Sequence, residues 1–143
     1  MLSLLYISRV AVSQALWDAT LSDIQAISVA RNAPLDITGL LIATPYWFAQ
    51  LLEGPPENID LVMMSILADR RHCDVRVVRR EMANQRRCPL WRLARFEQGT
   101  FETTYVRPVM ERTHDDADAD ALRLLDRLID HILIGGPELV VSG

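Results

Sequence analysis

The sequence predicts an α+β fold in which one β-sheet carries two helices on the same face. Three observations predict it: short apolar runs that end at turn residues, segments whose apolar residues repeat with helical spacing, and the order strand–helix–strand–strand–helix–strand. That order is the ferredoxin-like βαββαβ arrangement, here with one extra strand. Right-handed crossovers then place the first and third strands side by side at the sheet centre.

The predicted strands are short, and turn residues separate them. The second and third strands form a hairpin around Pro45 and Tyr46, and Gly54 ends the third. The first strand is apolar and buried, whereas the fourth alternates like a half-exposed strand. The five strands are expected at residues 2–9, 37–44, 47–53, 74–80 and 90–96.

Helical spacing of apolar residues predicts three helices, at residues 21–32, 57–68 and 117–134. The first begins at a capping box formed by Thr20 and Asp23, and Pro34 stops it soon after its end. Residues 10–19 fit either a loop or a first helical turn.

The last third of the chain is expected to cover the sheet face that the first two helices leave bare. Its helix has the clearest amphipathic stripe in the chain, and Gly135 and Gly136 supply a left-handed stop. Residues 97–113 stay unassigned because Pro108 interrupts the helix that would form there. The expected division is 1–97 for the sheet with its two helices and 98–143 for a helical cap in the same structural unit.

Length, charge and cysteine content narrow the function classes. The 143 residues suffice for one domain, and the formal net charge of −4 lacks the electrostatic footprint of a nucleic-acid-binding protein. Cys73 and Cys88 fit neither a disulfide framework nor a metal-ligand spacing. No apolar run approaches the ~20 residues that span a bilayer. We expect a cytoplasmic protein without a membrane segment, a metal or a nucleic-acid partner.

No catalytic arrangement stands out in the sequence. Ser, His and Asp never fall at a nucleophile-elbow spacing, and there is no glycine-rich phosphate loop. The remaining enzymatic alternative is an acylphosphatase type on the same fold, which needs an anion-binding loop after the first strand. Residues 9–12 lack the glycines for such a loop. We therefore expect no enzymatic activity.

Two polar residues fall at core positions of neighbouring strands. Period-two geometry places Tyr6 and Ser8 on one face of the first strand and Gln50 on one face of the third. An unpaired buried polar group costs ~1–3 kcal/mol, so Tyr6 and Gln50 either satisfy each other or serve a polar guest between the helices. The structural alternatives are a core tyrosine with its hydroxyl at the rim and a glutamine that bonds within the sheet.

The first helix carries a stripe of residues suited to the same polar guest. Ile24, Ser28 and Asn32 are spaced by four, with Arg31 beside them, which suits a flat ligand with a polar edge. The structural alternative for Asn32 is a cap at the helix end. Residues 70–72 likewise fit a solvated helix C-terminus.

The chain resembles a known family in a compound signature of ITGLLI, then F-x-Q-x-L-E-G, then D-R-R-H. The matching segments lie in the family's order at 4–9, 28–42, 48–59, 68–75 and 86–91. This family is the BLUF domains, sensors of blue light using FAD. The resemblance implies the fold derived above, with a flavin held non-covalently between the two helices.

The resemblance also implies a mechanism. Blue light drives electron and proton transfer from Tyr6, Gln50 then rotates or tautomerises, and the last strand reads out the change through Trp91 and Leu93. The flavin is FAD, although FMN and riboflavin share the ring that the pocket holds. The implied cofactor-binding positions are Ser8, Ile24, Ser28, Arg31, Asn32, Gln50, Ile66, Asp69, Arg71 and His72.

Two departures from the family pattern affect the readout. Leu93 stands where the family often has Met, and Leu cannot accept a weak hydrogen bond through sulfur. Cys88 stands where an aromatic residue is usual.

The alternative function is a BLUF-like interaction module that has lost its flavin. In either case we expect a downstream protein partner and a symmetric homo-oligomer.

Overall fold

The centre of the molecule is a mixed sheet of six strands in the order β4-β1-β3-β2-β5-β6. The computed structural model describes residues 1–135 and 139–141. β1 pairs antiparallel with β3 and β4, β2 pairs antiparallel with β3, and β5 runs parallel to β2 and β6. The strands are β1 (Leu2–Val10), β2 (Thr38–Ala43), β3 (Trp47–Gly54), β4 (His72–Met82), β5 (Trp91–Phe96) and β6 (Leu139–Val141).

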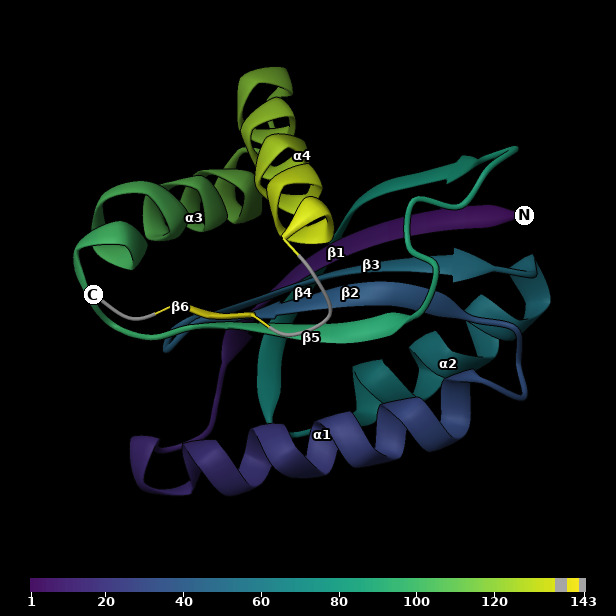
Figure 1. Ribbon diagram of the computed structural model, residues 1–143, viewed down its shortest axis with the longest axis horizontal. Coiled ribbons are helices and arrows are strands. Elements are labelled where there is room, and N and C mark those ends of the chain that lie inside the picture. The colour runs from purple at the N-terminus through teal and green to yellow at the C-terminus, as the bar shows by residue number, and fades with distance from the viewer. Residues whose placement is uncertain (136–138, 142–143) are drawn as a thin grey trace.

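Helices cover both faces of this sheet (Figure 1). α1 (Trp17–Asn32) and α2 (Pro56–Ala68) lie on one face, and α3 (Arg107–Asp115) and α4 (Ala119–Ile134) lie on the other. The predicted ferredoxin-like α+β fold is confirmed, including the central β1–β3 pair and the C-terminal helices on the second face. The sixth strand was not predicted.

Alternating side chains divide the core into two layers. Leu4 and Tyr6 of β1 pack in the layer with α1 and α2. Leu5 and Ile7 pack in the layer with α3 and α4. β1 and β3 are therefore buried on both faces, which explains why they appear in the sequence as nearly continuous apolar runs.

The start of α1 differs from the prediction. The helix begins at Trp17, after a short 3₁₀ turn at Gln14–Leu16, and no side chain caps its first turn. The predicted capping box of Thr20 and Asp23 is wrong because both residues lie inside the helix. Asp23 instead forms an ion pair with an arginine that follows α2.

The C-terminal helices also differ in detail. Pro108 does not interrupt the helix. It stands in the first turn of α3, directly after a π-helical turn over Glu102–Val106. Gly135 has a right-handed conformation, with φ −72° and ψ −2°, so the left-handed stop predicted there is wrong. Gly136 lies outside the described residues.

Candidate functional site

A row of side chains crosses the sheet on the face that α1 and α2 cover. Tyr6 of β1 lies opposite Gln50 of β3. Gln50 lies opposite Leu41 of β2, which in turn lies opposite Leu93 of β5. Trp91, two residues before Leu93, points to the same face. Four strands thus bring together side chains that are far apart in the sequence.

A chain of hydrogen bonds connects three of these residues. Nε2 of Gln50 donates to Oη of Tyr6 at 2.7 Å, and Nε1 of Trp91 donates to Oε1 of Gln50 at 2.9 Å. All three side chains are buried. Sequence reasoning anticipated that Tyr6 and Gln50 approach each other, whereas the contact to Trp91 was not anticipated.

The chemistry of Trp91 determines the orientation of the Gln50 carboxamide. An indole N–H can only donate, so the carboxamide oxygen must face Trp91 and the NH₂ group must face Tyr6. The Tyr6 oxygen therefore acts as an acceptor in this bond. Its own hydroxyl proton remains available to another group.

Burial dominates the electrostatics of Tyr6. Removal from water raises the pKa of its hydroxyl well above the ordinary value, and the hydrogen bond from Gln50 and the charge of Arg31 oppose that rise only in part. Tyr6 is therefore a neutral phenol across the physiological pH range.

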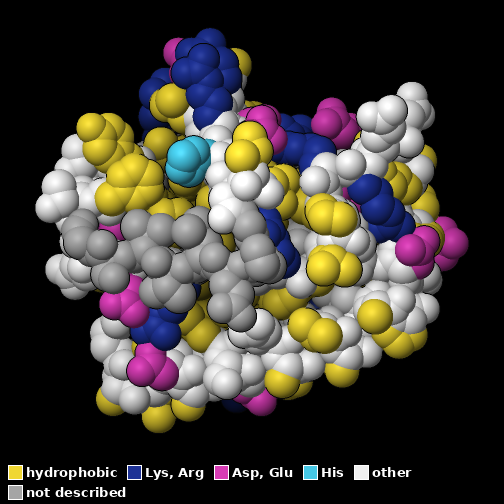
Figure 2. Space-filling model, viewed as in Figure 1, with side chains coloured by type: hydrophobic (Ala, Val, Ile, Leu, Met, Phe, Trp, Pro, Cys, Tyr) yellow, Lys and Arg dark blue, Asp and Glu magenta, His cyan; other side chains and the backbone are white. Residues whose placement is uncertain are grey.

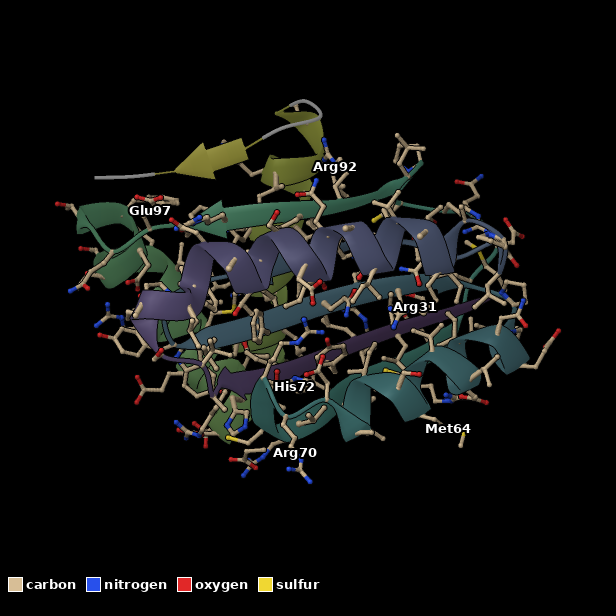
Figure 3. The ribbon with its side chains drawn as sticks, turned by 90° about the horizontal axis from the view of Figure 1, so that it is seen from below. Arg31, Met64, Arg70, His72, Arg92 and Glu97 are labelled. Carbon is tan, nitrogen blue, oxygen red and sulfur yellow. The ribbon has the colours of Figure 1, made fainter. Side chains whose placement is uncertain are left out.

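A pocket lies between α1 and α2 above this row, with about 500 Å³ of space that no protein atom fills, part of it open to solvent. Figure 3 shows Arg31 and His72 between these two helices. The predicted site residues that line the pocket are Tyr6, Ile24, Ser28, Arg31, Gln50, Ile66, Asp69, Arg71 and His72. Sequence reasoning missed four lining residues, namely Ile27, Leu41, Phe48 and Ser65.

Ser8 does not line this pocket but supports a residue that does. Its Oγ lies 2.7 Å from Nδ1 of His72, and Nε2 of His72 lies 2.6 Å from the carbonyl oxygen of Ile66. A carbonyl can only accept, so Nε2 of His72 carries the proton and Nδ1 accepts from the Ser8 hydroxyl. Ser8 thus orients His72 at one end of the pocket.

Asn32 has a buried polar group without a partner. Oδ1 accepts a hydrogen bond from Nε of Arg31 at 3.0 Å, but Nδ2 has no partner among the described residues. The alternative of a side-chain cap fails for the same reason, because Nδ2 reaches no helix carbonyl. A buried donor left unpaired costs ~1–3 kcal/mol, so this group is suited to a ligand with an acceptor edge. Asn32 borders an adjoining pocket that Trp91 also lines.

The far end of the main pocket carries the guanidinium of Arg71, which is already paired with carboxylates. Arg71 makes ion pairs with Asp69 at 2.6 Å and with Asp23 at 2.8 Å. The hydrogen bonds that Arg71 donates to the Asp69 carboxylate raise the pKa of the Arg71 guanidinium. The guanidinium is thus held at the pocket rim by carboxylates from α1 and from the segment after α2.

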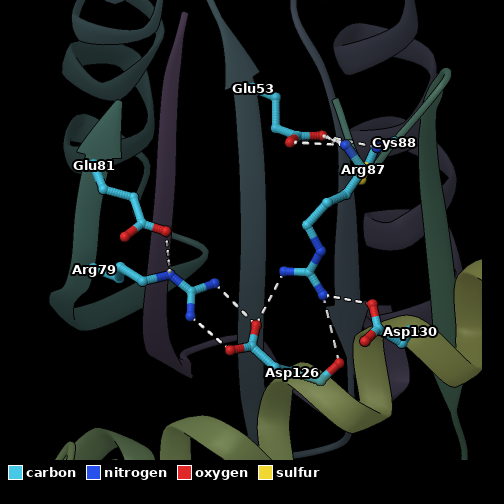
Figure 4. A network of polar contacts seen from close by, with 7 residues as sticks. All are labelled: Glu53, Arg79, Glu81, Arg87, Cys88, Asp126 and Asp130. Carbon is cyan, nitrogen blue, oxygen red and sulfur yellow. Dashed lines mark hydrogen bonds and ion pairs between the residues drawn. The ribbon is translucent and has the colours of Figure 1, made fainter. Parts of the chain in front are cut away.

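The segment that precedes β5 is anchored by a buried carboxylate that sequence reasoning missed. Glu53 of β3 is 1% exposed and accepts hydrogen bonds from the backbone N–H groups of Arg87 and Cys88, at distances from 2.8 to 3.0 Å (Figure 4). Burial, followed by the charge of Glu53, raises the pKa of the Cys88 thiol to about 12. The sequence signal that could have identified Glu53 is a charged residue at a buried position of a strand.

The same segment is attached to α4. Arg87 forms ion pairs with Asp126 at 3.0 Å and Asp130 at 2.7 Å, and Arg79 of β4 binds Asp126 through two hydrogen bonds (Figure 4). We call residues 83–90, between β4 and β5, the strap. It connects α4 to Trp91, the residue that donates to Gln50.

Residues 1–135 and 139–141 contain no group of three or more His, Cys, Asp or Glu residues placed to hold a metal ion. None of the helices in this part of the chain has both the length and the apolar character needed to cross a bilayer.

Comparison with known proteins identifies relatives in sequence. The family model described as sensors of blue-light using FAD matches residues 1–94. The photoactivated adenylate cyclase subunit alpha of Euglena gracilis is 39% identical over 75 residues, which are 52% of this chain and 7% of that protein. The blue light- and temperature-regulated antirepressor BluF of Escherichia coli is 34% identical over 55 residues, 38% of this chain and 14% of that protein. The matched part is therefore a small fraction of each of these relatives.

Solved structures agree with the fold. The dark-state structure of the BLUF protein BlrB has a TM-score of 0.73 and 27% identity, covering 92% of this chain and 96% of that one. The photo-activated state of BlsA, at 20% identity, has a TM-score of 0.74 and covers 95% and 96% of the two chains.

The neutral state of Tyr6 leads to a testable prediction. In an alkaline titration followed by the ultraviolet difference spectrum of tyrosinate, we expect Tyr6 to ionise only as the protein unfolds. The raised pKa of Tyr6 favours its protonated form, so its ionisation is displaced to the alkaline side. Tyr6→Phe should remove the part of the tyrosinate signal that appears only on unfolding. A tyrosinate signal from Tyr6 in the folded protein, measured as the difference between the unaltered chain and Tyr6→Phe, would contradict the assignment.

Proposed function

This chain belongs to the BLUF family of sensors of blue light using FAD, and we propose that it is a blue-light photoreceptor that holds a flavin non-covalently between α1 and α2. FAD is the cofactor of the family, and FMN and riboflavin carry the same ring. One observation supports the proposal more strongly than the others. Tyr6 and Gln50, which form a hydrogen-bond chain with Trp91, both line the pocket between the helices.

The residues present fit a flavin. The unpaired Nδ2 of Asn32, together with Arg31, suits the polar edge of the ring system. Ile24 and Ile66 offer apolar flanks from α1 and α2. Arg71, His72 and Asp69 stand at the end suited to the ribityl-phosphate chain, where a guanidinium pairs well with phosphate oxygens.

When bound, the flavin supplies the absorption of blue light and a transient acceptor for an electron and a proton. Tyr6 is the donor in our proposal, because it is neutral and its hydroxyl proton is not committed to Gln50. The electron and the proton return to Tyr6 afterwards, but while they are away the bond that the Tyr6 oxygen accepts from Nε2 of Gln50 is disturbed. The Gln50 carboxamide is then free to rotate or tautomerise.

The two neighbours of Gln50 respond differently to such a change. Tyr6 can reverse its role, since a hydroxyl can donate as well as accept. Trp91 cannot, because a turned carboxamide presents its N–H groups to an indole that only donates. The altered Gln50 therefore keeps a bond to Tyr6 and loses the bond from Trp91. This difference converts a local change into a displacement at the start of β5.

The strap is the route by which we expect the signal to leave. Trp91 follows the strap directly, and Arg87 within it binds α4 through Asp126 and Asp130. Leu93 lies two residues further along β5, opposite Leu41. With Leu at position 93 there is no sulfur acceptor, so we assign the main readout to Trp91 and the strap. The receiving element is α4.

The visible absorption spectrum before and after blue light tests the photoreceptor proposal. We expect a flavin spectrum that shifts slightly to the red in light and recovers in the dark. Tyr6→Phe should still bind flavin but lose the shift completely, because phenylalanine can neither release a proton nor bond Gln50. Tyr46→Phe, which alters an exposed tyrosine, should behave like the unaltered protein. Colourless protein that takes up no added flavin would instead support the flavin-free interaction module.

The strap route is tested by hydrogen exchange of the α4 backbone in dark and light. Arg87→Ala removes ion pairs that are partly exposed and together stabilise the contact by about 1 kcal/mol. We expect several-fold faster exchange in α4 in the dark and little further change in light. Arg80→Ala, which breaks an exposed pair with Asp60 of α2, is the matched control and should keep the full light response. Equal light responses in the two variants would rule out the route.

A further inference from the structure

A groove on the side of the sheet away from the flavin pocket remains uncovered within the described structure. It lies between α4 and the segment formed by the π-helical turn and α3, with about 1020 Å³ of unfilled space, part of it open to solvent. Its walls are apolar and include Phe101, Tyr105, Val109, Leu124 and Leu128. Tyr105 is 63% exposed and Leu124 is 37% exposed. Figure 2 shows hydrophobic side chains gathered over the region of α3.

The rim of this groove carries the positive charge of Arg127. The imidazole of His131 lines the groove one helical turn further along α4, and no acidic side chain of the described residues lines it. Within the described residues, every arginine except Arg70 and Arg127 makes a hydrogen bond or an ion pair. An apolar groove with a cationic rim is complementary to an apolar surface with acidic residues beside it.

Such a surface exists on α2 of the same chain. Leu61, Met64 and Leu67 are 55%, 70% and 60% exposed and repeat every three residues along the outer side of the helix. Glu57 and Asp60 stand at the N-terminal end of this stripe, and both are exposed. Figure 3 shows Met64 on the side of α2 that faces away from α1. We call these five residues the α2 stripe.

The groove and the α2 stripe cannot meet within one molecule. α2 covers one face of the sheet, whereas α3 and α4 cover the other (Figure 1). A contact between them must therefore join two copies of the chain. Because the two surfaces differ, the contact is head-to-tail. An open assembly therefore keeps one free groove at one end and one free stripe at the other, unless a ring closes.

We propose that the α3–α4 groove is the docking site for the α2 stripe of a second copy, and that the chain assembles head-to-tail through this contact. The mode is a helix laid in an apolar groove, with residues at i, i+3 and i+6 as anchors. Asp60 is already paired with Arg80, so Glu57 is the acidic residue of the stripe that faces Arg127. This assembly goes beyond the photoreceptor proposal and does not depend on it. It joins the two helices that the proposed switch reaches, since α2 lines the flavin pocket and α4 binds the strap.

Complementation between two variants tests the proposal, with sedimentation velocity of the full chain in the dark as the measurement. Met64→Asp disables the stripe and leaves the groove intact, whereas Leu124→Asp does the opposite. We expect the unaltered chain to sediment as an oligomer and each variant alone as a monomer. An equal mixture of the two variants should form a one-to-one dimer, because one groove and one stripe remain intact. A symmetric face-to-face contact would not behave in this way.

Charge reversal and a control complete the experiment. Arg127→Glu should weaken association at least tenfold, and Glu57→Arg in the same chain should restore it. Met82→Asp alters a residue of β4 that is 68% exposed and lies outside both surfaces, so it should leave the oligomer unchanged. Thermal unfolding followed by circular dichroism checks that each variant folds. A monomeric unaltered chain, an oligomer that persists in both surface variants, or a mixture that remains monomeric would overturn the proposal.

Discussion

The carboxamide of Gln50 is held between a group that can only donate a hydrogen bond and a group that can either donate or accept one. Burial makes this asymmetry decisive, because water cannot replace a lost partner. The observed arrangement satisfies Trp91 and Tyr6 together. Any reversal of the carboxamide satisfies Tyr6 alone. In our proposal the site switches between these two arrangements, which differ at Trp91.

The fold positions this carboxamide through its sheet topology. The antiparallel pairing of β3 with β1 places Tyr6 on one side of Gln50, and the β3–β2–β5 pairing brings Trp91 to the other. Gly39 lies opposite Trp91, and a Cβ there would collide with the carbonyl oxygen of Leu51. On the opposite face of the sheet, Glu53 holds the strap that leads into Trp91. The two layers of the core are thus linked at the beginning of β5, where the strap leads into Trp91.

Local pattern in the sequence predicted the central features, because they depend on short-range periodicity. Alternation placed Tyr6 and Gln50 on the face that the helices cover, and spacing by four placed Ile24 and Ser28 on the pocket side of α1. Long-range contacts could not be predicted in this way. The bonds from Glu53 to the strap and from Arg87 to α4 join segments that are 34 and 39 residues apart. The start of α1 was missed because a 3₁₀ turn, and no side-chain cap, precedes it.

The most direct test of the account is the nuclear magnetic resonance signal of the Trp91 indole N–H in flavin-loaded protein, in darkness and in light. The chain has three tryptophans, so nitrogen-15-labelled tryptophan gives three indole signals, and Trp91→Phe identifies the relevant one. The account predicts that illumination moves the Trp91 signal toward that of an indole without an acceptor, and that darkness restores it. A flavin spectrum that shifts while the Trp91 signal stays in place would contradict the central role of the Gln50–Trp91 bond.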